Sequence, residues 1–277
     1  MVGVFLGLFS LFSLFSDVRH ASQGCTSGEC VQLLNRDLKG IVQTHFHGAQ
    51  KIREILPKVL KALKPYALKP RFEMYSISLC PDEINKERTT LSTLLNNHYD
   101  KVFRTGGVGG MPFAGKTGFM SVSHRVPTDG HLVVMFGPHL GLSPDGEPGK
   151  LMQFGQAAVA NACAAVAEAN ERLTSGDTMR VDAATALPCG LGEQRAPKIE
   201  IMAKATKRVV PLHFKLYKVI EQQILTVANT NYGTGKLVLL GGITINMPHP
   251  MPGYFLPLHF SIRSEGQMPV DLMRLFS

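Results

Sequence analysis

The chain has 277 residues, of which 44 % are hydrophobic and 18 % are charged. This balance is typical of a folded protein and excludes an intrinsically disordered chain. The net charge is +8, but the basic residues are dispersed rather than gathered into a stripe with interleaved aromatic residues. Nucleic-acid binding is therefore not indicated. Five cysteines in a chain of this length do not suggest a disulfide scaffold.

The N-terminal segment, residues 2–16, is uncharged and largely apolar. It is short for a membrane span and fits a signal-peptide core, the first half of a bipartite plastid leader or a membrane-associated anchor. It therefore indicates a plastid or an endomembrane lumen, and membrane contact is expected only through this segment. We assign residues 1–31 to a leader and linker and residues 32–277 to one folded domain.

Strands and helices are expected to alternate along residues 32–277. The predicted elements are helical segments over 31–63, interrupted near Gly48 and at Pro57; a strand over 71–79; a helix from Asp82 to Phe103; strands over 119–125 and 131–137; helices over 156–170 and 212–230; and strands over 236–246 and 254–263. This order predicts an α/β fold whose sheet is at least partly parallel and flanked by helices.

Three residues in these elements form a candidate zinc-ligand set. Cys80 ends the predicted strand 71–79, His139 closes the run that starts at His131, and Cys163 lies in the Ala-rich stretch 156–170. Two thiolates and one imidazole leave the fourth tetrahedral position free, as a catalytic zinc site requires. Spacing alone favours ordinary buried cysteines instead, because no close CxxC or HxxxH pair is present.

The order of several short segments adds a resemblance to a known family. These segments are Ser78-Leu79-Cys80-Pro81-Asp82-Glu83, Thr105-Gly106-Gly107-Val108-Gly109-Gly110, Gly115-Lys116-Thr117-Gly118, Phe136-Gly137-Pro138-His139-Leu140-Gly141, Asp145-Gly146-Glu147-Pro148-Gly149 and Ala162-Cys163-Ala164. Together they resemble the limiting-CO2-inducible protein B/C family, also described as theta-class carbonic anhydrases. The resemblance extends over residues 45–272.

The resemblance implies a fold similar to β-carbonic anhydrases and a zinc ion held by Cys80, His139 and Cys163. It implies a lyase that interconverts carbon dioxide and bicarbonate through a zinc-bound hydroxide. It also implies a homodimer with the site near the subunit interface. The alternative is a zinc-binding but catalytically silent member that acts through protein contacts in a carbon-concentrating assembly.

Asp82 is the expected catalytic side chain beside the metal. By the resemblance, its carboxylate either accepts a hydrogen bond from the hydroxide or takes the fourth zinc position in a resting form; a helix cap is the alternative role. The β-carbonic anhydrase pattern is Cys-x-Asp-x-Arg, but Ile84 stands at the Arg position here. Lys86 and Arg88 are candidate substitutes outside that register, and this departure bears directly on turnover.

His45 and His47 are candidate proton shuttles by the same resemblance. Residues two apart on a helix face different directions, so at most one is expected to reach the site. His124 is a further candidate for the same role. For all three histidines, a plain surface position is the more common alternative.

Residues 110–117 match the phosphate-binding pattern GxxxxGK[ST]. This motif works only between a strand and a helix, where backbone amides surround phosphate. The residues after Gly118 favour a strand, and Pro112 lacks an amide donor. We therefore predict a glycine-rich loop near the zinc site rather than a nucleotide site.

Overall fold

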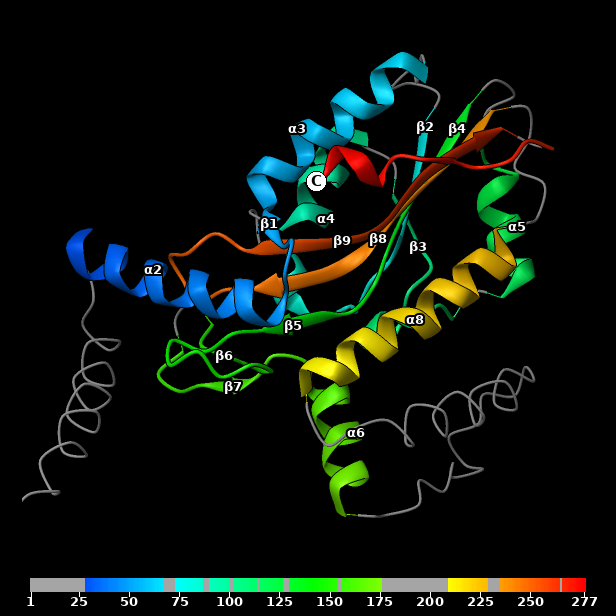
Figure 1. Cartoon of the computed structure of the whole chain (residues 1–277). Coiled ribbons are helices and arrows are strands. Elements are labelled where there is room, and N and C mark those ends of the chain that lie inside the picture. The colour runs from blue at the N-terminus through cyan, green and yellow to red at the C-terminus, as the bar shows by residue number, and fades with distance from the viewer. Residues whose placement is uncertain are drawn as a thin grey trace, which may run out of the picture.

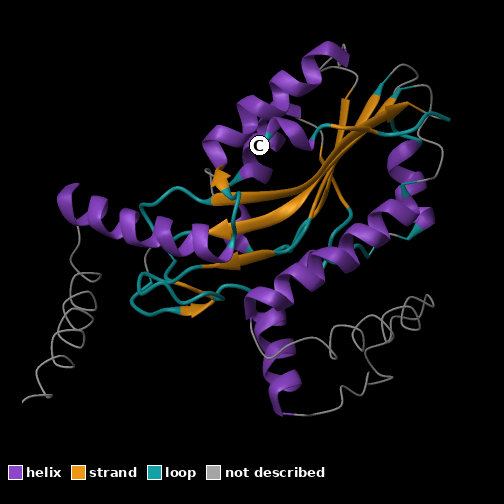
Figure 2. Ribbon diagram, in the orientation of Figure 1, coloured by secondary structure: helices purple, strands orange, loops and turns teal. Residues whose placement is uncertain are grey.

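A central sheet with helices on both faces organises the chain (Figures 1 and 2). The computed structural model describes residues 28–66, 73–86, 90–99, 102–113, 115–126, 130–153, 156–175, 209–228, 235–264 and 266–277. Its helices are α2 (Gly28–His45), α3 (Ile52–Leu63), α4 (Leu91–Tyr99), α5 (Lys116–Ser123), α6 (Ala164–Ser175) and α8 (Val209–Val227). None of the helices in these ranges is long and apolar enough to cross a membrane.

The main sheet has the strand order β1-β9-β8-β4-β2-β3, with β5 also paired to β8 and β10 to β9. Its strands are β1 (Gln50–Lys51), β2 (Glu73–Ser78), β3 (Val102–Arg104), β4 (His131–Phe136), β5 (His139–Gly141), β8 (Lys236–Asn246), β9 (Tyr254–Ser264) and β10 (Val270–Asp271). The pairs from β3 through β2 and β4 to β8 are parallel, whereas β9 is antiparallel to β8. The predicted α/β fold with a partly parallel sheet is confirmed.

The alternation of side chains in β4 separates two hydrophobic cores. Val133 and Met135 point into the core beneath α3 and α4. Leu132, Val134 and Phe136 point into the core beneath α8. Because successive side chains in a strand face opposite sides, one apolar run supplies both cores. The helices that cover the two faces are visible in Figure 1.

Two predicted elements have a different secondary structure. Residues 119–125 were expected to form a strand, but residues 116–123 form α5. Phe119 and Val122 of this helix are buried, whereas Met120 is exposed. This spacing of three residues is that of one helix face, and tertiary packing on the core therefore decides the conformation.

The helix predicted from Asp82 to Phe103 is also wrong in its extent. The chain forms a short 3-10 turn at Glu83–Lys86, then α4 and then β3. The interruption expected at Pro57 is absent, because Pro57 lies within the continuous helix α3. The predicted interruption near Gly48 is confirmed by the gap between α2 and α3.

Two candidate ligands have different local settings from those predicted. Cys163 immediately precedes α6 and follows a short strand, β7 (Ala160–Asn161), which pairs with β6 (Lys150–Leu151). His139 starts β5 rather than closing the strand from His131. Most of residues 1–31 lie outside the described ranges, so the division at residue 31 stays a prediction.

Glu73, the first residue of β2, provides a test of the buried sheet. It is 4 % exposed, and burial raises its pKa from 4.5 to about 7. The folded chain therefore retains a proton that the unfolded chain loses, so this contribution to stability is complete below pH 4.5 and is lost as the pH rises through about 7.

We expect Glu73→Gln to raise the free energy of unfolding by up to about 3 kcal/mol at pH 8 and to change it little at pH 4. Urea unfolding at the two pH values measures the difference. The matched control is Glu54→Gln, at an exposed site on α3, which should change stability by no more than about 0.5 kcal/mol. Equal gains at both pH values would contradict the burial argument.

Candidate metal centre

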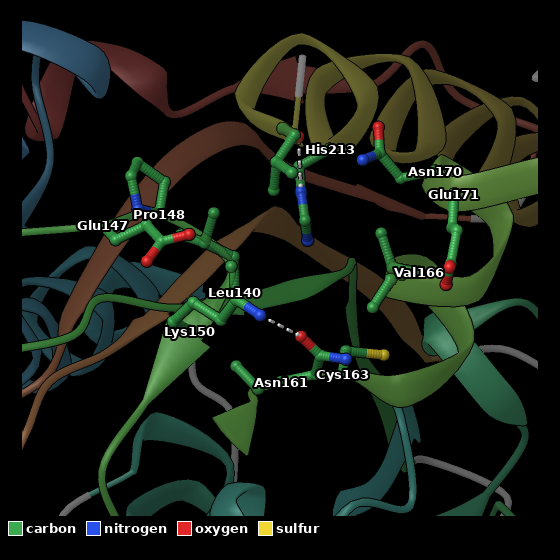
Figure 3. Close-up of a pocket in the computed structure, with 14 residues that line it drawn as sticks. Leu140, Glu147, Pro148, Lys150, Asn161, Cys163, Val166, Asn170, Glu171 and His213 are labelled. Atoms are coloured by element: carbon green, nitrogen blue, oxygen red, sulfur yellow. Dashed lines mark hydrogen bonds between the residues drawn. The ribbon is translucent and has the colours of Figure 1, made fainter. Parts of the chain in front are cut away.

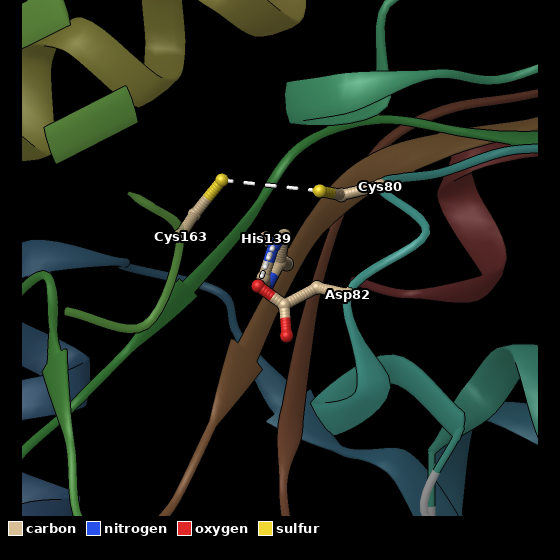
Figure 4. A group of neighbouring side chains, drawn as sticks. All are labelled: Cys80, Asp82, His139 and Cys163. Carbon is tan, nitrogen blue, oxygen red and sulfur yellow. Dashed lines mark hydrogen bonds and ion pairs between the residues drawn. The ribbon is translucent and has the colours of Figure 1, made fainter. Parts of the chain in front are cut away.

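Four side chains converge beyond the carboxyl ends of β2 and β4 (Figure 4). Cys80 and Asp82 follow β2, His139 begins β5, and Cys163 precedes α6. One potential ligand atom from each residue lies within 4.8 Å of the others. Sites in parallel α/β folds commonly lie at this edge, where loops from separate strands meet. Thus the fold brings the predicted trio together with Asp82.

The sulfurs of Cys80 and Cys163 lie within hydrogen-bonding distance of each other. Their separation is 3.9 Å, and the backbone N–H of Gly109 donates to Cys80 Sγ at 3.3 Å. The hydrogen bond with Cys163 lowers the pKa of Cys80, and burial opposes this effect. The same bond, together with burial, raises the pKa of Cys163. Cys80 is therefore the first of the two to become a thiolate, the form that binds metal.

His139 presents an unpaired nitrogen to this cluster. Its side chain is 1 % exposed, and Nδ1 lies 3.2 Å from Asn246 Oδ1. Nε2 is buried without a hydrogen-bond partner and lies 4.0 Å from Asp82 Oδ2. A buried polar atom without a partner is costly. A metal ion would satisfy it, and two thiolates with an imidazole are ligands that zinc prefers.

Asp82 is the most exposed of the four, at 18 % for its side chain. One carboxylate oxygen, Oδ1, accepts a hydrogen bond from the Ile84 N–H at 3.4 Å. Burial raises the pKa of Asp82, while His139 lowers it. Asp82 thus lies on the open side of the cluster, where it can meet an incoming water molecule.

Ile84 occupies the position where β-carbonic anhydrases carry arginine. It is fully buried and packs in a small apolar cluster with Leu151 and Ala162. Within the described ranges, no lysine or arginine forms an ion pair with Asp82. The side chain of Lys86 and the whole of Arg88 lie outside those ranges. Their predicted role beside Asp82 is therefore untested.

The candidate shuttle histidines lie on the surface. His45 is the last residue of α2, with its ring edge-on to Phe46, and His47 follows shortly after; both are exposed. His124 is exposed at the end of α5. A role for any of them in proton transfer stays a prediction.

Two residues at the site were not predicted from the sequence. Asn246 ends β8 and contacts the His139 ring. His213 of α8 places Nε2 3.0 Å from the main-chain oxygen of His139 and Nδ1 2.8 Å from that of Val209. Burial lowers the pKa of His213 to about 4, and a neutral ring can donate its single N–H to only one of these two oxygens. The sequence feature that could have identified them is a polar residue within or beside an apolar run. His213 lies among the apolar residues of α8, and Asn246 ends the apolar strand β8.

A cavity of about 270 Å³ adjoins the cluster (Figure 3). Cys163 and His213 both line it, together with the apolar side chains of Leu140 and Val166. The volume suffices for several water molecules or a small substrate. The protein therefore holds an accessible space directly beside one candidate ligand.

Three amides of the glycine-rich loop before α5 are already engaged within that segment. The expectation of a strand after this loop was wrong, since α5 follows it. However, the amides of Gly110, Met111 and Phe113 already donate to main-chain carbonyls of the same segment. Because these amides cannot also surround a phosphate, the nucleotide interpretation remains disfavoured. The contact of Gly109 with Cys80 supports the predicted position of the loop near the site.

The fold and the cluster together are those of a carbonic-anhydrase-like protein. The chain belongs to the family of limiting CO2-inducible proteins B/C beta carbonic anhydrases, whose sequence profile matches residues 49–264. No curated protein is significantly similar in sequence.

Solved structures of limiting CO2-inducible proteins resemble the chain. The crystal structure of PtLCIB4, a homolog of the limiting CO2-inducible protein LCIB, is similar with 26 % identity and a TM-score of 0.72, over 84 % of this chain and 98 % of that chain. The structure of the limiting CO2-inducible protein LCIB itself shares the fold at 14 % identity, with a TM-score of 0.61, over 83 % of this chain and 96 % of that chain.

Proposed function

We propose that this protein catalyses the zinc-dependent, reversible hydration of carbon dioxide to bicarbonate, with Cys80, His139 and Cys163 as the metal ligands. The observation that carries the proposal is the buried, unpaired Nε2 of His139, in a cluster of one imidazole, two thiols and one carboxylate whose ligand atoms lie within 4.8 Å of one another. Family membership supports the same chemistry. We also propose, from the family resemblance, that the active form is a homodimer.

Each residue of the cluster has a distinct task in this proposal. A bound zinc ion would supply an activated water for attack on carbon dioxide, because it lowers the pKa of that water to about 7. The Gly109 N–H stabilises the Cys80 thiolate. Asp82, on the open side, accepts a hydrogen bond from the reacting water and orients it.

A second candidate function follows from Ile84. Within the described ranges no cation lies beside Asp82, and its carboxylate belongs to the same cluster as the other three ligand groups, with all four ligand atoms within 4.8 Å of one another. Four protein ligands would close a tetrahedral site, as in structural zinc centres. The alternative is therefore a catalytically silent zinc protein that acts through protein contacts. Proton-release stopped flow on the zinc-loaded chain distinguishes the two.

Asp82→Ala is the most direct test of these alternatives. We expect the variant to keep about one zinc per chain, since three ligands remain, and to lose roughly 100-fold in hydration rate, as expected when a positioned carboxylate is removed. Asp37→Ala, which removes an exposed carboxylate on α2, should keep the parent rate. A faster rate in Asp82→Ala would instead show that the carboxylate blocks the site.

A further inference from the structure

Asn246 is held beside His139 by both its main chain and its side chain. It is the last residue of β8, which pairs in parallel with β5, the strand that His139 begins. The Asn246 carbonyl accepts the N–H of Leu142 at 2.9 Å. Its amide oxygen lies 3.2 Å from His139 Nδ1, and the residue is buried. The sheet register therefore places this amide against the imidazole.

The contact has a chemical consequence for the imidazole. An amide oxygen only accepts hydrogen bonds, so His139 Nδ1 must carry the proton. Nε2, which lies 4.0 Å from Asp82 Oδ2, then has a free lone pair. The opposite tautomer would bury an Nε2–H donor at a position where Nε2 has no hydrogen-bond partner and where Asp82 Oδ2, at 4.0 Å, is too far away. Both observations favour the tautomer that can bind metal through Nε2.

We propose that Asn246 is a positioning residue that holds His139 in its metal-binding tautomer before any metal arrives. Outer partners of this kind set the orientation and basicity of a histidine ligand, and their loss typically lowers metal affinity by about 10- to 100-fold. The consequence for zinc rests on the proposed function. The predicted tautomer of the metal-free protein does not depend on the proposed function.

The first measurement is the tautomer of His139 in the full, metal-free chain. Long-range 1H–15N spectra of 15N-histidine-labelled protein at pH 8 distinguish Nδ1–H from Nε2–H, and His139→Gln identifies the signals. We expect the Nδ1–H form in the parent and in Asn246→Asp, whose carboxylate accepts the same proton. Asn246→Leu should shift towards the Nε2–H form that free imidazole side chains prefer.

The second measurement is zinc affinity by competition with a chromophoric chelator. Asn246→Leu should bind zinc about 10- to 100-fold more weakly than the parent, and Asn246→Asp should stay close to it. Asn97→Leu, the same change at an exposed position of α4, serves as the control and should match the parent.

The outcomes separate this inference from the proposed function. An unchanged tautomer and unchanged zinc affinity in Asn246→Leu would overturn the role of Asn246. If that variant does not fold, Asn246→Asp decides, because an Nε2–H form there would equally overturn it. A parent chain with the Nδ1–H tautomer but no zinc binding would refute the proposed function and leave the positioning of His139 supported.

Discussion

Cys80→Ser is expected to reduce carbon dioxide hydration by the zinc-loaded chain to the rate measured without protein. The substitution removes the thiol whose pKa the Cys163 hydrogen bond lowers and which accepts the Gly109 N–H. A neutral hydroxyl is a poor zinc ligand in place of a thiolate. Because even outer partners of a ligand contribute about 10- to 100-fold to metal affinity, zinc binding should weaken by more than about 100-fold.

The measurement is proton-release stopped flow with a pH indicator, combined with the zinc content of the same samples. Cys189→Ser, the same change at a cysteine in the segment Leu187-Pro188-Cys189-Gly190, is the matched control. It should keep both zinc and rate. Hydration by Cys80→Ser at the parent rate would contradict the ligand assignment. A parent chain that binds zinc but does not hydrate carbon dioxide would favour the silent alternative.

Gly137→Ala is expected to destabilise the protein by more than about 4 kcal/mol, the range reached only by severe local conflicts. Gly137 lies between β4 and β5 with φ of 142°, and an added Cβ would lie 1.8 Å from the main-chain oxygen of Gly242. That oxygen belongs to the central strand β8 and cannot move aside as a flexible side chain would. Because His139 begins β5 two residues later, zinc binding should be lost together with the fold.

Urea unfolding and the yield of soluble protein measure this effect. Gly40→Ala provides the control, since Gly40 lies within α2 and an added Cβ would meet nothing within 4 Å. Alanine there should stabilise the helix by up to about 1 kcal/mol. A Gly137→Ala variant as stable as the parent would show that the turn between β4 and β5 does not approach β8 so closely.

Local sequence was sufficient for the long apolar strands. The run over residues 236–246 predicted β8 with its observed limits, and the run from His131 predicted β4 to within one residue. Both runs are rich in Val, Leu and Ile and are bounded by polar or turn-forming residues, which favours buried strands. The candidate ligands also emerged from sequence, through the order of short segments shared with one family.

Tertiary structure decided what short apolar runs and single residues cannot specify. Residues 119–122 suit a strand or a helix locally, and the burial of Phe119 and Val122 on one face selects the helix. Asn246 is separated from His139 by 107 positions, and Cys80 from Cys163 by 83. No local pattern links residues so far apart, because only the register of the parallel strands and the packing of α6 bring their side chains together. Sequence therefore determined which residues are chemically suited to hold a metal, and the fold determined that their ligand atoms meet.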